Sequence, residues 1–200
     1  FYKALILGMR VNSADVVYIL YDYNLQEQLP KPLEYIIAVD VGISASATTF
    51  ITMGRARDGK LYIYNSYYHR NGKQSIEGAM EYDDYADQLV EYYKEESERY
   101  GQAARYVFVD KDISMLRILT RKFTENEIPK SKLNYVIKEK IAARITQTRN
   151  LLYVGDLIID DKLEEVKRAI TNAVYDPKSV DKGKLERLDD TNLAFNPIDI

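Results

Sequence analysis

The chain lacks cysteine and tryptophan and contains a single histidine, His69. Without cysteine it can form no disulfide, no thiolate zinc site and no cysteine nucleophile, and one imidazole excludes a metal site built from several histidines. No stretch approaches the roughly 18 consecutive apolar residues of a membrane-spanning helix, and the N-terminus resembles neither a secretory signal nor a transit peptide. We therefore expect no membrane partner, and chemistry that depends on oxygen-bearing side chains.

The composition is that of an ordinary globular domain. The 200 residues are 46% hydrophobic, enough for one core with a short additional segment. The 28 basic and 31 acidic residues give a net charge of −3, which argues against a surface that is basic all over. Because the chain begins at Phe1 and stops abruptly at Ile200, we expect it to be part of a longer polypeptide.

Periodicity predicts an α/β fold. Apolar runs predict strands, and apolar stripes at helical spacing predict helices. The Asp58-Gly59 pair predicts a tight hairpin turn between two of the strands. The strands are expected at 16–21, 35–39, 47–53, 61–67, 106–109 and 134–137, and the helices around 82–93, 116–123, 141–152 and 163–173. From residue 35 onward, this order predicts a ribonuclease H-like mixed sheet, with a three-strand antiparallel meander, then parallel strands, and helices on both faces.

Two aspartates stand directly after buried-type strands. Asp40 follows the apolar run at 35–39, and Asp110 follows the run at 106–109. If these strands are neighbours in the sheet, the two carboxylates emerge side by side at its carboxyl edge. Two such carboxylates repel each other unless a cation neutralises them, and hard oxygen ligands select Mg²⁺ or Mn²⁺. The alternative is that each aspartate only terminates its strand and caps a turn. The pair together favours a metal site that holds two ions.

A two-ion site needs a third acid. The candidates are Asp189, Asp190 and Asp199, all of which follow the last predicted helix. Asp199 follows Pro197, a residue suited to the first turn of a helix that could cross the site. The adjacent Asp189 and Asp190 could equally form a solvated charge pair in a loop.

A series of short motifs, in order, resembles the nuclease domain of tailed-bacteriophage large terminase subunits. No motif is specific alone, but their order and spacing are. They are Tyr35–Gly42, Thr48–Gly54, Asp58–Ile63, Tyr106–Asp110, Lys138–Ile145 and Leu152–Val154. Residues 5–8, followed by the predicted strand at 16–21, are similar to the link from the ATPase domain of that family.

The resemblance implies a metal-dependent endonuclease that cuts concatemeric double-stranded viral DNA during genome packaging. Asp40 and Asp110 match the first two metal ligands of the family. The third family acid stands in a His-x-x-Asp-Ala-Leu-x-Tyr segment that this chain lacks, so Asp199 could occupy the place of that acid or of the histidine. Residues 1–34 would then be a linker from an N-terminal ATPase domain, and 35–200 the nuclease domain. The chain itself has no Gly-x-x-x-x-Gly-Lys-Ser/Thr motif, so we expect no ATP hydrolysis from it.

The implied partners are double-stranded DNA, the terminase small subunit, the portal protein and the ATPase domain, in a packaging complex in the host cytoplasm. Candidate DNA contacts are Lys138, Lys140 and Arg144 beside the predicted site, and Lys182 and Lys184 in a later loop. The alternative for each lysine is a solvated helix face or loop. We expect the Tyr67-Tyr68 pair to be packing residues.

Two other functions are compatible with the same fold. One is a catalytically silent ribonuclease H-like module that docks a portal, motor or small subunit. The other is a different ribonuclease H-like nuclease, such as a junction resolvase or an RNA–DNA hybrid nuclease. Cleavage assays on linear duplex, four-way junction and hybrid substrates distinguish these functions.

Overall fold

The computed structural model describes residues 16–42, 47–70, 80–110, 112–135 and 140–175. Four strands come first, and helices and strands alternate after them. The strands are β1 (Leu25–Gln26), β2 (Glu34–Asp40), β3 (Ala47–Arg55), β4 (Leu61–Arg70), β5 (Val107–Val109), β6 (Leu133–Tyr135) and β7 (Leu157–Asp160). The helices are α2 (Tyr82–Tyr100), α3 (Ile113–Glu125), α4 (Ile141–Val154) and α5 (Glu164–Thr171), with short 3-10 turns at Asp22–Asn24 and Lys130–Lys132.

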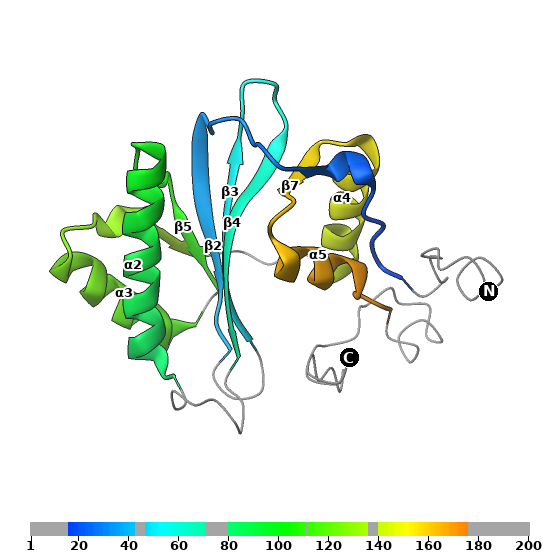
Figure 1. Ribbon diagram of the computed structural model, residues 1–200. Helices are drawn as coiled ribbons and strands as arrows, with labels where there is room; N and C mark the ends of the chain where they lie inside the picture. The colour runs from blue at the N-terminus through cyan, green and yellow to red at the C-terminus, as the bar shows by residue number, and fades with distance from the viewer. Residues whose placement is uncertain (1–15, 43–46, 71–79, 111, 136–139, 176–200) are drawn as a thin grey trace.

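The strands form one mixed sheet in the order β1-β7-β4-β3-β2-β5-β6. β2, β3 and β4 make an antiparallel meander, and β5, β6, β7 and β1 join it through parallel pairs. Figure 1 shows α2 and α3 on one face of the sheet and α4 and α5 on the other. The predicted meander, parallel strands and two helical layers are confirmed.

The hairpin between β3 and β4 turns where the sequence predicts it. Gly59 has a φ of +84°, a conformation that glycine adopts without strain. The Asp58 carboxylate accepts hydrogen bonds from the Lys60 backbone N–H at 3.1 Å and from the Tyr62 hydroxyl at 2.6 Å. These contacts stabilise the tight connection that makes β3 and β4 antiparallel neighbours.

The larger core lies between the sheet and the layer of α2 and α3. Tyr35, Ile37 and Val39 project from β2 into this core and are buried there, together with the apolar stripe of α2. α2 ends where Gly101 takes a left-handed φ of +64°, as its position after the stripe predicts. Alternate residues of β2 therefore face away from α2 and α3.

A β-bulge interrupts the pairing of β3 with β4. Thr52 pairs with Asn65 and Met53 pairs with Ile63, so Tyr64 is an extra residue in β4. Before the bulge, Ile63 packs into the core under α4. After it, Asn65 contacts Glu96 of α2. The bulge therefore exchanges the two faces of β4 partway along the strand.

Two sequence predictions were wrong on this side of the sheet. Residues 157–160 form β7, a strand that was not expected because it is short and follows α4 closely, after the Gly155 cap. Residues 16–21 do not form a strand. Val16 makes one isolated bridge with Val174, and Val17 is buried against α4 and Ala173, which follows α5. An apolar run of this length has the same pattern whether it pairs in a sheet or packs on helices.

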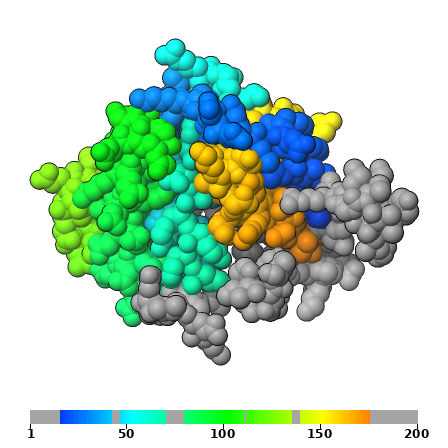
Figure 2. Space-filling model, in the orientation of Figure 1, coloured from blue at the N-terminus to red at the C-terminus, as the bar shows by residue number. Residues whose placement is uncertain are grey.

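The described part of the N-terminal segment packs against the domain that follows it. Asn24 is fully buried, and its side-chain amide donates to the carbonyl oxygens of Leu152 and Leu157 at 2.9 and 3.0 Å. β1 extends the sheet beyond β7, and Figure 2 shows this segment, in blue, against the yellow and orange helices. The division at residue 34 remains a prediction. No helix in the described ranges is both long and apolar enough to cross a membrane.

Candidate metal centre

Asp40 and Asp110 lie at the ends of neighbouring parallel strands. β2 pairs with β5 in the register Ile37 to Val107 and Val39 to Val109, so each aspartate is the next residue after the last aligned pair. Adjacent strands are separated by about 4.8 Å. The structure therefore brings together two carboxylates that are far apart in sequence, as the strand order predicts.

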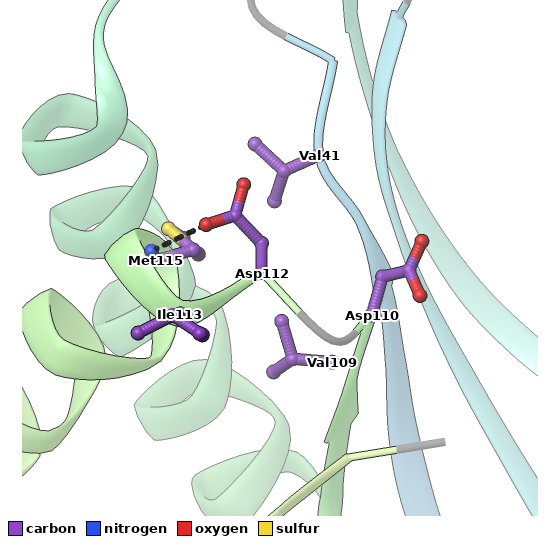
Figure 3. Close-up of a pocket in the computed structure, with 6 residues that line it drawn as sticks. All are labelled: Val41, Val109, Asp110, Asp112, Ile113 and Met115. Carbon is purple, nitrogen blue, oxygen red and sulfur yellow. Dashed lines mark hydrogen bonds between the residues drawn. The ribbon is translucent and has the colours of Figure 1, made fainter. Parts of the chain in front are cut away.

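Both aspartates belong to the face of the sheet opposite α2 and α3. Val39 and Val109, one residue earlier, are buried under those helices, and successive side chains in a strand alternate. The Asp40 side chain is exposed and that of Asp110 is half-buried. Figure 3 shows the Asp110 carboxylate on the side of the strand end away from α3. The pair is therefore accessible from the solvent.

A hollow of about 450 Å³ opens where β2 and β5 meet the start of α3 (Figure 3). Its walls include two acids and apolar residues from β5, from α3 and from the position just after β2. The lining residues are Val41, Val109, Asp110, Asp112, Ile113 and Met115. Asp110 thus stands between this hollow and the open face of the sheet.

Asp112 is an acid of this region whose role was not predicted. One carboxylate oxygen accepts from the backbone N–H groups of Ser114 and Met115 at 2.8 and 3.1 Å, which makes it the N-cap of α3. The other accepts from the Tyr82 hydroxyl of α2 at 2.6 Å. The Tyr82 hydrogen bond, followed by the Met115 one, holds the pKa of Asp112 below its usual value.

These contacts assign Asp112 a structural role. With both oxygens engaged, its side chain fixes the start of α3, and its backbone N–H donates to the Asp110 carbonyl at 2.6 Å. It therefore holds the turn that follows Asp110. The sequence signal was present, because an aspartate directly before an amphipathic helical stripe is a typical N-cap.

A buried threonine restrains the other side of the site. Thr48, at the start of β3, is fully buried. Its hydroxyl accepts from the Gly42 N–H at 3.1 Å and donates to the Gly42 carbonyl at 3.0 Å. This reciprocal pair fixes the backbone two residues after Asp40. Both strand ends that present an aspartate are thus tied to a neighbouring element.

His69 takes no part in the site. Its Nδ1 lies 2.8 Å from the hydroxyl of Tyr85 on α2, so the ring occupies the face of the sheet opposite Asp40.

The donor chemistry of the pair fits a hard divalent cation. Asp40 and Asp110 offer carboxylate oxygens from rigid strands, and their like charges favour a bound cation. No group of three acids or histidines suited to a metal ion occurs among the described residues. The candidate third ligands, Asp199 and Asp190, lie outside the described ranges, so their roles remain predictions.

The predicted DNA contacts are only partly described. Lys140 is the N-cap residue of α4 and Arg144 lies one turn later, both exposed, on the helical layer that shares a face with Asp40. Their spacing of four places them on one side of the helix. Lys138, Lys182 and Lys184 lie outside the described ranges. A role in DNA binding remains a prediction for all five.

No protein-family model matches the chain, and no curated protein matches it significantly. Solved structures do. The large terminase of a thermophilic bacteriophage aligns over 96% of this chain and 45% of its own length, with a TM-score of 0.71 and 18% identity. The nuclease domain of the P22 large terminase aligns over 89% of this chain and 86% of its own, with a TM-score of 0.59 and 8% identity.

A third structure is the nuclease domain of g2p, the large terminase of bacteriophage SPP1, solved with bound Mn. It aligns over 87% of this chain and 92% of its own, with a TM-score of 0.52 and 13% identity. The chain thus spans less than half of the thermophilic phage protein but most of the two isolated nuclease domains. At these identities the likeness shows the fold. The ribonuclease H-like prediction is confirmed, and the resemblance seen in the motifs is matched by a shared architecture.

Proposed function

We propose that this chain is the nuclease domain of a tailed-bacteriophage large terminase subunit, and that it cuts concatemeric double-stranded DNA during genome packaging. The observation that supports this most is the pairing of β2 with β5, which sets Asp40 and Asp110 side by side on an accessible face. The g2p nuclease domain, which shares the fold, was solved with bound Mn.

Asp40 and Asp110 hold two Mg²⁺ or Mn²⁺ ions, and Asp199 or Asp190 completes the ligand set. When bound, the ions supply an activated water and stabilise the leaving oxygen of the phosphodiester. Asp112 and Thr48 keep the two strand ends in place, because each fixes the backbone beside one ligand. A shift of about 1 Å in such ligands is enough to slow a reaction severely.

Lys140 and Arg144 bind phosphates of the duplex beside the centre. The protein as a whole is acidic, so the ions provide much of the positive charge that the DNA meets. We therefore expect weak DNA binding when divalent ions are removed.

The partners in this proposal are DNA, an ATPase domain N-terminal to this segment, the terminase small subunit and the portal protein, assembled in the host cytoplasm. The large terminase of the thermophilic bacteriophage, which shares this fold, was also solved in complex with ATP-γ-S.

Nicking of supercoiled plasmid tests the proposal. The parent chain is compared with Asp40→Asn and Asp110→Asn in EDTA, Mg²⁺ and Mn²⁺. Asp156→Asn is the matched control, because it removes the same charge from an exposed position beside the start of β7, which is separated from β2 by β4 and β3.

We expect cleavage by the parent and by Asp156→Asn that requires a divalent ion and disappears in both site variants. Cleavage that survives both site substitutions refutes the proposed centre. A folded parent that leaves linear duplex intact but cuts four-way junctions or RNA–DNA hybrids would reassign the substrate. A parent inactive on every substrate at high Mn²⁺ would favour the silent docking module.

A further inference from the structure

One exposed tyrosine belongs to the same transverse row of the sheet as the two aspartates. Asp40 pairs with Thr49 of β3, and Thr49 pairs with Tyr68 of β4. Residues paired across a sheet project from the same face, so Tyr68 shares its face with Asp40 and, through β5, with Asp110. Two strand spacings separate Tyr68 from Asp40, a distance of about 10 Å between the Cα atoms.

The bulge at Tyr64 sets this orientation. Beyond the bulge, Asn65 and Tyr67 face α2, so Tyr68 faces the other way. β7 pairs only with Leu61–Ile63, at the opposite end of β4. In the described part of the chain, no strand therefore flanks β4 at Tyr68 on the side away from β3, and 47% of this residue is exposed.

The Tyr68 hydroxyl also differs from other tyrosine hydroxyls of the domain. Those of Tyr62, Tyr82 and Tyr92 each have a hydrogen-bond partner within the fold. Within the described ranges, Tyr68 has no such partner and no ring contact. Its hydroxyl is a neutral donor on a rigid strand, available to an external acceptor.

We propose that Tyr68 is a DNA-positioning residue, whose hydroxyl donates to a backbone phosphate of the duplex cut at Asp40 and Asp110. The inference rests on the proposed nuclease function and deepens it by assigning the path of the substrate. Tyrosine is a common donor to phosphate oxygens in protein–DNA complexes. The span of about 10 Å corresponds to about three nucleotides of rise along a strand, at about 3.4 Å each. The duplex thus crosses the sheet from β5 toward β4.

Fluorescence anisotropy tests this contact. The probe is a short fluorescein-labelled DNA duplex, with Ca²⁺ replacing Mg²⁺ so that it is bound and not cut. Tyr68→Phe removes only the hydroxyl. The matched control is Tyr153→Phe, which removes the hydroxyl of a residue that is 70% exposed at the end of α4.

We expect Tyr68→Phe to raise the Kd about fivefold to tenfold, the loss typical of one hydrogen bond to a charged group. Tyr153→Phe leaves it unchanged. Because the tyrosine is neutral, the slope of log Kd against log salt stays the same in Tyr68→Phe, whereas Arg144→Ala lowers it by about one. In Mn²⁺, Tyr68→Phe raises KM and leaves kcat at saturating duplex near the parent value.

Several outcomes overturn the inference. They are a Tyr68→Phe variant that binds like the parent, a control that weakens binding equally, a loss confined to kcat, or a parent that does not bind duplex at all. Failure of the nuclease proposal is read separately in the plasmid assay, from nicking that survives Asp40→Asn and Asp110→Asn or from a parent that cuts no substrate. A binding defect in Tyr68→Phe can be measured whether or not the chain cuts DNA. Thermal unfolding of each variant verifies that it is folded.

Discussion

Replacing Asp112 by alanine should both destabilise the fold and weaken the candidate site. The change removes the N-cap of α3, whose loss costs about 1 kcal/mol. It also removes the acceptor of the Tyr82 hydroxyl, a hydrogen bond to a charged group whose contribution at this partly exposed position is reduced by solvent to about 1 kcal/mol. The expected loss in the free energy of unfolding is therefore about 2 kcal/mol.

The pH dependence of that loss gives a second measure. Because the pKa of Asp112 is lowered in the folded protein, its stabilising effect is present above the unfolded value of about 3.9 and is lost as the pH falls through the lower folded value. The difference between parent and Asp112→Ala should stay constant between neutral pH and about pH 5, and shrink below about pH 4.

Urea unfolding followed by circular dichroism measures both effects. Asp112→Asn is the control, since asparagine caps helices about as well as aspartate, and with its amide oxygen capping α3 its amide N–H can donate to the Tyr82 hydroxyl. It should lose less than half as much stability as the alanine variant. Two results would refute the reasoning, namely an alanine variant within about 0.5 kcal/mol of the parent, or a stability difference that grows on acidification.

Three further predictions concern other parts of the fold. Gly54→Ala should lower the free energy of unfolding by about 1–3 kcal/mol in urea titrations, because its Cβ would stand 2.7 Å from the Glu34 carbonyl oxygen; an unchanged midpoint would contradict this. Asn65→Ala should cost about 2–3 kcal/mol, since it removes a 2.9 Å hydrogen bond from the fully buried Glu96 carboxylate; calorimetry showing a loss under about 1 kcal/mol would count against it. Mn²⁺ should raise the Tm of the parent but not of Asp40→Asn, and equal shifts in the two would place the ion elsewhere.

The sequence allows the sheet and its two aspartates to be predicted because the information is local. Asp40 and Asp110 each follow an uninterrupted apolar run, and such runs are typical of strands buried on both faces. The short connections around Asp58 and Gly59 then leave few possible topologies. Fold class and the placement of this pair follow from those features together.

The remainder depends on tertiary context. Val17 lies in an apolar run whose sequence pattern is the same for a strand as for a segment packed on helices. Only its contacts with α4 and Ala173 in the folded protein distinguish the two. β7 has only four residues and follows the Gly155 C-cap of α4 closely, so the sequence pattern did not predict it as a strand. The Tyr67-Tyr68 pair was expected to pack, and Tyr67 does so by stacking on Phe50, whereas Tyr68 is exposed. The sequence alone does not distinguish these two tyrosines, because the pairing register of β4 with β3 decides which of them faces α2. The third metal ligand remains a prediction.

The extra residue in β4 makes the length of this strand as important as its composition. Leu61 and Ile63 belong to the core under α4, but beyond Tyr64 the odd-numbered residues face α2 instead. Most substitutions in the strand affect one contact. Deletion of Tyr64 would restore simple alternation and leave Tyr67 and Tyr68 on their present faces. Deletion of Ser66 with the bulge retained would instead turn Tyr68 toward the core of α2 and Tyr67 toward the face of the aspartates. A one-codon deletion beyond Tyr64 should therefore be far more damaging than any single exposed substitution in the strand.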